Sequence, residues 1–322
     1  MLRFLIGRVV KIVIILFAIT VLNFCLIHMA PGDPALVMAG EAGDADPQFI
    51  EDLRRQFGLD QPFYIQLWTY LSHFAQGDLG YSYRQQAPVL SLILERLPAT
   101  LILSISAFVI SLGLGVLAGV VAAARQGRWS DSLISTVALL FYATPLFWMA
   151  LMAVLLFSVT FGWFPAFGYE TAASSYTGLA RAWDIARHLV LPAVTLGLFF
   201  MATYVRITRA SMLEVNRLDF VKTARAKGLK PSVIQRRHVL RNAILPVVTL
   251  AGLHAGQLVG GAVLIETVFA WPGIGRLMFE ALQSRDYNLL LGVFTVSAAL
   301  VLLFNLFTDL LYRVVDPRIR LA

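Results

Sequence analysis

The sequence contains six long runs of apolar residues without a charged side chain. They occupy Ile12–Met29, Pro98–Ala124, Ser132–Phe161, Leu189–Val205, Asn242–Ile265 and Tyr287–Thr308. About 20 apolar residues in a helix cross the hydrocarbon core of a bilayer, which is about 30 Å thick. Because lipid offers the backbone no hydrogen-bond partner, a run that crosses this core has to be helical. The runs therefore predict an all-α, polytopic membrane protein with six transmembrane helices.

The composition excludes the main soluble classes. Apolar residues make up 58% of the 322 residues and charged residues only 14%, whereas soluble domains have about 25% charged residues. A soluble protein of this size could not cover so much apolar surface with polar side chains. Cys25 is the only cysteine, which excludes a disulfide scaffold. Basic residues close to anionic lipid explain the net charge of +7, so we expect contact with membrane lipid and none with nucleic acid.

Lysine and arginine are concentrated in alternate segments between the runs. If the N-terminus is cytoplasmic, the inside segments hold 18 of the 26 basic residues and all four lysines. The positive-inside rule therefore predicts that both termini are cytoplasmic. The chain then divides into a cytoplasmic end with the first helix (1–29), a small periplasmic segment (30–97) and a core with the other five helices (98–322).

The sequence lacks the common catalytic motifs. It has no phosphate-binding loop of the form Gly-x-x-x-x-Gly-Lys-Ser/Thr, no His-Glu-x-x-His pair and no Gly-x-Ser-x-Gly elbow. Its five histidines lack the spacing of metal ligands. An ion-driven carrier needs ionisable groups deep in its helices, but Glu266 and Asp309 lie near the ends of their runs. We therefore expect no catalytic residue, metal or cofactor on this chain, and either an energy source on other chains or a passive pore.

A basic segment of about residues 214–246 connects the fourth and fifth runs. Asp219 is the predicted N-cap and Gly228 the predicted C′ residue of a short helix. Ser232 and Gln235 form a capping-box pattern, which predicts the start of a second helix. The first helix is amphipathic, so it either rests on lipid as an interfacial helix or docks a cytoplasmic partner.

This segment carries a family resemblance. Residues 219–228, followed by residues 241–246, resemble the EAA loop of ABC-importer permeases of the dipeptide/oligopeptide/nickel branch. Aligned on Gly228, the EAA triplet falls on Lys222, Thr223 and Ala224, so only its last position is kept. Further motifs that resemble this branch occur at Pro31–Pro34, Gly58–Pro62, Gly77–Gly80 with Ser82, Pro88–Val89, Arg96–Thr100, Arg209–Glu214, Glu266–Gly273, Arg285–Tyr287 and Asp316–Arg320. The chain is similar to the first of the two permease subunits over nearly its whole length.

The resemblance implies a permease subunit of an importer in a bacterial inner membrane. A second, homologous permease subunit would complete the translocation path for di- or oligopeptides. Two cytoplasmic ATPase subunits would bind ATP and Mg²⁺, and a periplasmic or lipid-anchored binding protein would deliver the substrate. The same machinery importing nickel, glutathione or another small ligand is an alternative. A stand-alone channel, a secondary carrier or a membrane-embedded enzyme would be a different class of protein.

The resemblance also implies which residues couple the chain to the ATPases. They are Asp219, Phe220, Lys222, Thr223, Ala224, Arg225, Ala226, Lys227, Gly228 and Leu229. In the fifth run, His254 and Gln257 are either hydrogen-bond groups between helices or polar lining of the path. Gly115 and Gly119 have the spacing that allows two helices to approach closely, as do Gly252, Gly256 and Gly260.

Overall fold

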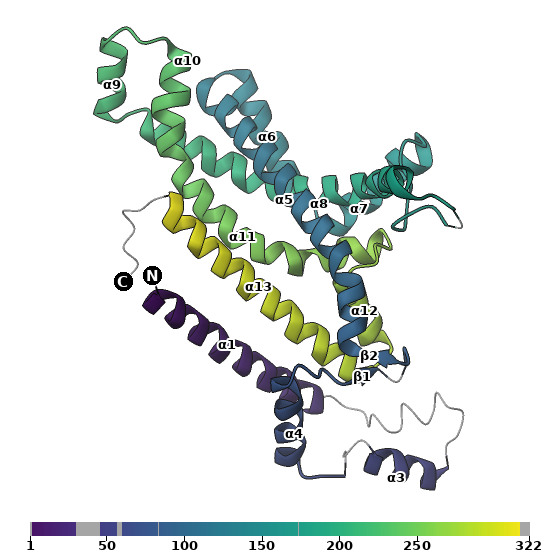
Figure 1. Cartoon of the computed structure of the whole chain (residues 1–322). Helices are drawn as coiled ribbons and strands as arrows, with labels where there is room; N and C mark the ends of the chain where they lie inside the picture. Colours follow the sequence, from purple (N-terminus) through teal and green to yellow (C-terminus); the bar gives the residue numbers. More distant parts are fainter. Residues whose placement is uncertain (1, 30–45, 57–59, 83, 173, 316–322) are drawn as a thin grey trace. The chain divides into compact units, whose positions relative to one another are not determined.

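The computed structural model describes residues 2–29, 46–56, 60–82, 84–172 and 174–315, almost all of them in helices (Figure 1). The first part of the chain contains α1 (Leu2–Met29), α3 (Pro47–Gln56), α4 (Phe63–Ala75) and a short hairpin of β1 (Tyr81–Ser82) and β2 (Ala87–Pro88). The remaining elements are α5 (Val89–Ala124), α6 (Trp129–Ala143), α7 (Leu146–Ala153), the π-helix η1 (Val154–Thr160), α8 (Gly178–Val215), α9 (Asp219–Ala226), α10 (Pro231–Val233), the π-helix η2 (Ile234–Leu240), α11 (Arg241–Val268), α12 (Ile274–Gln283) and α13 (Tyr287–Val315). Some of the motifs that resemble the family lie outside the described residues. These are the motifs at 31–34 and 316–320, and residues 58 and 59 of the motif at 58–62.

Helices cover all six predicted runs, which confirms the all-α prediction. Among the described residues, Ile6–Leu26, Val89–Ala124, Gly178–Val215 and Tyr287–Leu306 are single helices long and apolar enough to cross a membrane. The fifth run lies in α11, which has 28 residues. The helices of the second and fourth runs, α5 and α8, extend well beyond the apolar residues that predicted them.

The third run was predicted as one helix, and this is wrong. α6 ends at Ala143, and α7 leaves at an angle of 103° to it. Thr144, between them, has φ −82° and ψ 131°, an extended conformation. A residue before proline is pushed out of the helical region by the proline ring, so Pro145 explains the break. The third run is therefore a bent pair of helices.

The chain forms two compact units, and the predicted boundary between residues 97 and 98 lies next to the division between them. The first unit contains Met1–Pro98 together with Arg276–Leu302, and the second contains Ala99–Gly275 and Leu303–Ala322. The grouping of residues 276–302 with the N-terminal part was not predicted from the sequence. The predicted single core of residues 98–322 is thus shared between the two units.

In the first unit, the hairpin is tied to the first turn of α13. Tyr81 pairs with Pro88 and Ser82 with Ala87 in an antiparallel register. The Ser82 hydroxyl donates to the Asp286 carboxylate, whose other oxygen accepts the backbone N–H of Leu289. Asp286 is therefore the N-cap of α13 as well as the anchor of the hairpin. Two motifs of the family resemblance thus meet, although 204 residues separate these two side chains.

In the second unit, α8 packs against α6, α7 and α11. The turn that follows α11 is hydrogen-bonded to Ala99 and Thr100 of α5, the first two residues of the second unit. The Thr100 hydroxyl donates to the fully buried Glu266 carboxylate over 2.7 Å and accepts the Ile274 N–H over 2.8 Å. The indole N–H of buried Trp271 donates to the Ala99 carbonyl over 2.9 Å. This network fixes the end of α11 against α5.

Candidate functional site

The short helix predicted between Asp219 and Gly228 exists as α9, and its end has the predicted geometry. Gly228 has φ +70°, a left-handed conformation that suits glycine. Its N–H donates to the Arg225 carbonyl, and the Leu229 N–H donates to the Ala224 carbonyl. These two bonds are those of a Schellman motif with Gly228 at C′. The predicted C′ residue is therefore confirmed.

Two predicted caps in this segment are wrong. Leu218 is the N-cap of α9, and Asp219 is its first helical residue, with its carboxylate 2.8 Å from the Lys222 ammonium. The second helix starts at Pro231 and has no capping box. Proline at the first helical position needs no N–H partner, and the Gln235 side chain donates instead to the Asn216 side chain over 3.0 Å.

One side of α9 holds the helix against the rest of its unit. Val221 and Ala224 are buried, and they pack in a cluster with Met212 of α8, Ile234 of η2 and Ala243 of α11. The Gln235–Asn216 hydrogen bond joins η2 to the residue that follows α8. The helix is therefore a fixed part of the second unit, and it lies beside the helix formed by α10 and η2 (Figure 1).

The other side of α9 is exposed, and it carries apolar and cationic groups together. Of the ten predicted coupling residues only Ala224 is buried; the exposed ones are Asp219, Phe220, Lys222, Thr223, Arg225, Ala226, Lys227, Gly228 and Leu229. Phe220 is 42% exposed and Leu229 39%. We call the exposed surface formed by Leu218, Phe220, Lys222, Arg225, Lys227 and Leu229 the α9 surface. It combines an aromatic side chain with an arginine, two residue types that are enriched at protein–protein interfaces, and with two lysines.

The candidate path residues are only partly described. His254 is half-buried in α11, with its ring 5.5 Å from the rings of Phe200 and Tyr204 of α8. Its Nδ1 is buried and makes no hydrogen bond among the described residues. The side chain of Gln257 and the surroundings of Gly260 lie outside the described residues. The roles of His254 and Gln257, as hydrogen-bond groups between helices or as lining of the path, stay predictions. The described residues hold no cluster of metal-ligand side chains.

An ion pair that the sequence did not reveal lies near the C-terminal end of α8, the end that leads to α9. The Arg209 guanidinium donates to both carboxylate oxygens of Asp131, over 2.6 and 2.8 Å. Asp131 is in the first turn of α6, its side chain is 5% exposed, and it also accepts the Gly127 N–H. Asp131 directly precedes the third apolar run and Arg209 follows the fourth, so only the folded chain shows that they meet. The pair joins α6 to α8.

We expect Asp131→Asn to lower the free energy of unfolding by about 2 kcal/mol, because hydrogen bonds to charged groups contribute about 1.5–3 kcal/mol. The change removes the charge that Arg209 faces and one of its acceptor oxygens. Denaturant unfolding of the purified chain in detergent measures the effect. Asp219→Asn is the matched control: its ion pair with Lys222 is exposed, and such pairs contribute only about 0–1 kcal/mol. Equal effects of the two variants would contradict the bracing role of Asp131.

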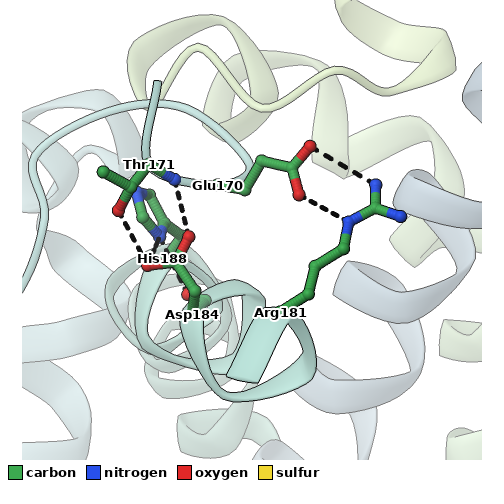
Figure 2. Close-up of polar contacts among 5 residues, drawn as sticks. All are labelled: Glu170, Thr171, Arg181, Asp184 and His188. Atoms are coloured by element: carbon green, nitrogen blue, oxygen red, sulfur yellow. Dashed lines mark hydrogen bonds and ion pairs between the residues drawn. The ribbon is translucent and has the colours of Figure 1, made fainter. Parts of the chain in front are cut away.

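A second polar cluster braces the loop before α8 (Figure 2). The Arg181 guanidinium donates to both oxygens of Glu170, and the Asp184 carboxylate accepts the N–H and the hydroxyl of Thr171. His188 Nδ1 lies 2.8 Å from the Asp184 carbonyl oxygen. No sequence motif points to these residues. They fix the loop to the first turns of α8.

Comparisons with known proteins agree with this architecture. Residues 115–321 match the family model of binding-protein-dependent transport system inner membrane components, and residues 1–104 match the model of the N-terminal part of such membrane components. The chain is 41% identical to a dipeptide transport system permease protein of Alkalihalophilus pseudofirmus, over 99% of this chain and 100% of the other. It is 40% identical to a glutathione transport system permease protein of Escherichia coli, over 99% of each chain.

Solved structures agree on the fold. A chain of the inward-facing MetNI methionine ABC transporter aligns with a TM-score of 0.57 and 18% identity, over 70% of this chain and 96% of the other. The family match and the apolar helices place the protein in the inner membrane, and proteins of this family act with ATPase and substrate-binding partners. The chain belongs to the inner membrane components of binding-protein-dependent transport systems, and it is a permease subunit of an ABC importer.

Proposed function

We propose that this permease imports di- or oligopeptides, with two ATPase subunits that bind ATP and Mg²⁺ in the cytoplasm. A second, homologous permease subunit completes the path, and a periplasmic or lipid-anchored binding protein delivers the peptide. The relatives named for dipeptide and for di/tripeptide transport, each 41% identical to this chain, support the substrate class. The concentration of lysine and arginine in alternate connecting segments supports cytoplasmic termini.

The α9 surface is the proposed contact through which the ATPase subunits move the helices of the permease. Val221 and Ala224 anchor α9 to α8, η2 and α11, so a force applied to α9 reaches two long helices. Phe220 offers an apolar side chain that a groove on an ATPase can bury, and Lys222, Arg225 and Lys227 favour an acidic rim around that groove. Closure of the ATPases on ATP would then bias the permease between two conformations, because the partner binds one of them better.

We expect Phe220→Asp to reduce transport and substrate-stimulated ATPase activity of the assembled complex at least about tenfold. Burial of a phenylalanine side chain contributes about 1.5–3 kcal/mol, and each 1.4 kcal/mol is about tenfold in affinity. The variant should insert and fold normally, because Phe220 is exposed in the isolated chain. Peptide uptake and phosphate release in nanodiscs or proteoliposomes measure the effect.

Two controls separate coupling from folding. Phe220→Leu keeps an apolar side chain and should retain most of the activity. Val221→Asp places a charge in the buried cluster and should instead lower the yield of folded protein. Normal peptide uptake by Phe220→Asp would remove the coupling role of the α9 surface.

The substrate class is tested separately from coupling. The complex, reconstituted with its ATPases, is given the binding protein loaded with a dipeptide, with a longer peptide or with glutathione. We expect dipeptides or oligopeptides to stimulate ATP hydrolysis more than glutathione does. Stimulation by glutathione alone would place the chain with its glutathione-transporting relatives instead and would leave the coupling role intact.

A further inference from the structure

The helix α4 has three distinct sides. Successive residues of an α-helix are about 100° apart around its axis. One side contacts α1 through Tyr70 and through the ring of Phe63, which is still 47% exposed. A second side holds the exposed apolar side chains Tyr64, Ile65 and Trp68, and a third holds the exposed polar side chains Thr69 and His73, followed by the C-cap residue Gln76. Tyr64 is 71% exposed and Trp68 73%. The helix contains no Asp, Glu, Lys or Arg.

The packed side of α4 lies against one end of α1. Phe24 is 3% exposed, and its ring is 5.5 Å from the ring of Phe63 and 5.4 Å from that of Tyr70. The apolar span of α1 runs from Ile6 to Leu26, so these contacts fall at its last turn. Arg8 and Lys11 are at the opposite end of that span. The contacts therefore place α4 at the level where α1 leaves the hydrocarbon core, on the side away from these cations.

The last turns of the α1 span expose apolar side chains too. Leu22 and Leu26, in the last two turns of the α1 span, are each 57% exposed, as expected for side chains that face lipid. Tyrosine and tryptophan prefer the headgroup level of a membrane, where the ring is buried and its polar atom stays hydrated. A helix with adjoining apolar and polar exposed sides lies in the plane of the interface, with its apolar side toward the acyl chains.

We propose that α4 is an interfacial helix of the outer leaflet, with Tyr64, Ile65 and Trp68 among the lipid headgroups and Thr69, His73 and Gln76 toward water. The partner of this surface is lipid, rather than the binding protein or another subunit. By holding the last turn of α1 through Phe24, α4 sets the depth of the first span. The proposal rests on the membrane insertion of the chain and on the proposed cytoplasmic N-terminus, and not on its substrate.

Spin labels on two neighbouring residues test the proposal. In a Cys25→Ser background, Trp68→Cys and Thr69→Cys each carry one nitroxide, and each chain is assembled with its partner subunits in nanodiscs. Collision with oxygen, which concentrates in lipid, and with a water-soluble nickel chelate is measured by power saturation. We expect the ratio of oxygen to nickel accessibility to be severalfold higher at residue 68 than at residue 69.

The other outcomes overturn the proposal. Equal, water-like ratios at residues 68 and 69 would mean that α4 stands in the aqueous phase. Protection of residue 68 from both reagents would mean that a protein covers it. Tyr64→Cys is a second probe of the apolar side, with the same expectation, if Trp68→Cys does not assemble. His73→Cys is the second probe of the polar side.

Discussion

Gly119→Leu is expected to lower the free energy of unfolding by about 3 kcal/mol, at the upper end of the cost of overpacking. A Cβ atom on Gly119 would lie 2.6 Å from Thr208 Cβ and 2.8 Å from the Val205 carbonyl oxygen of α8. A Cβ on Gly115, one turn earlier, would lie 2.5 Å from Tyr204 Cβ. Because one of these obstacles is backbone, a larger residue has to push α5 and α8 apart.

The same helix supplies the control for this prediction. Gly113 is exposed, and a Cβ there would meet nothing within 4 Å. Gly113→Leu adds the same side chain to α5 and should leave stability within about 0.5 kcal/mol, as surface substitutions usually do. Denaturant unfolding in detergent compares the two variants. Similar losses in both would mean that the added side chain itself, rather than its contact with α8, explains the effect, because leucine is the better helix former.

Glu266→Ala should also lower the free energy of unfolding by about 3 kcal/mol, because it opens a cavity and takes the acceptor away from a buried hydroxyl group. Glu266 is fully buried and accepts the Thr100 hydroxyl, which in turn accepts the Ile274 N–H. Without the carboxylate, the end of α11 loses its hydrogen bond to Thr100 of α5, and the bonds of Trp271 and Ile274 are left to join the turn to α5. The loss should appear as a lower unfolding midpoint and as proteolysis near residue 271.

Glu280→Ala is the matched control for Glu266→Ala. Glu280 forms a partly exposed i,i+4 ion pair with Arg276 on α12, and helix pairs of this spacing contribute about 0.3–0.5 kcal/mol. Thr100→Val tests the same network from the other side, since it keeps the volume but removes the hydroxyl. If Glu266→Ala were no more harmful than Glu280→Ala, the buried network would not hold the turn.

Local patterns predicted much of the secondary structure. Charge-free runs located the helices, because a backbone in lipid has no alternative to helical hydrogen bonds. Gly228 was recognised as a C′ residue because its left-handed conformation suits glycine. The errors arose where two local signals competed. At Ser232 a capping-box pattern competes with the adjacent Pro231, which starts the helix, and at Pro145 a proline interrupts a long apolar run.

The site was predictable only in part. Family-like residues located α9, and its periodicity showed that it is amphipathic. Periodicity did not show that Val221 and Ala224 are buried while Phe220 stays exposed, since all three are apolar. The partners of Asp131 and Glu266 could not be predicted from the sequence either, because 78 residues separate Asp131 from Arg209 and 166 separate Glu266 from Thr100.

The sequence by itself determined the class of the protein, the position of its helices along the chain and the family it resembles. These depend on hydrophobicity, charge and short motifs, which act over a few residues. Only the tertiary structure decided where the third run bends, which face of α9 is free, and which distant side chains pair. Those outcomes depend on side chains from several helices that compete for the same buried space, and this competition exists only once the chain has folded.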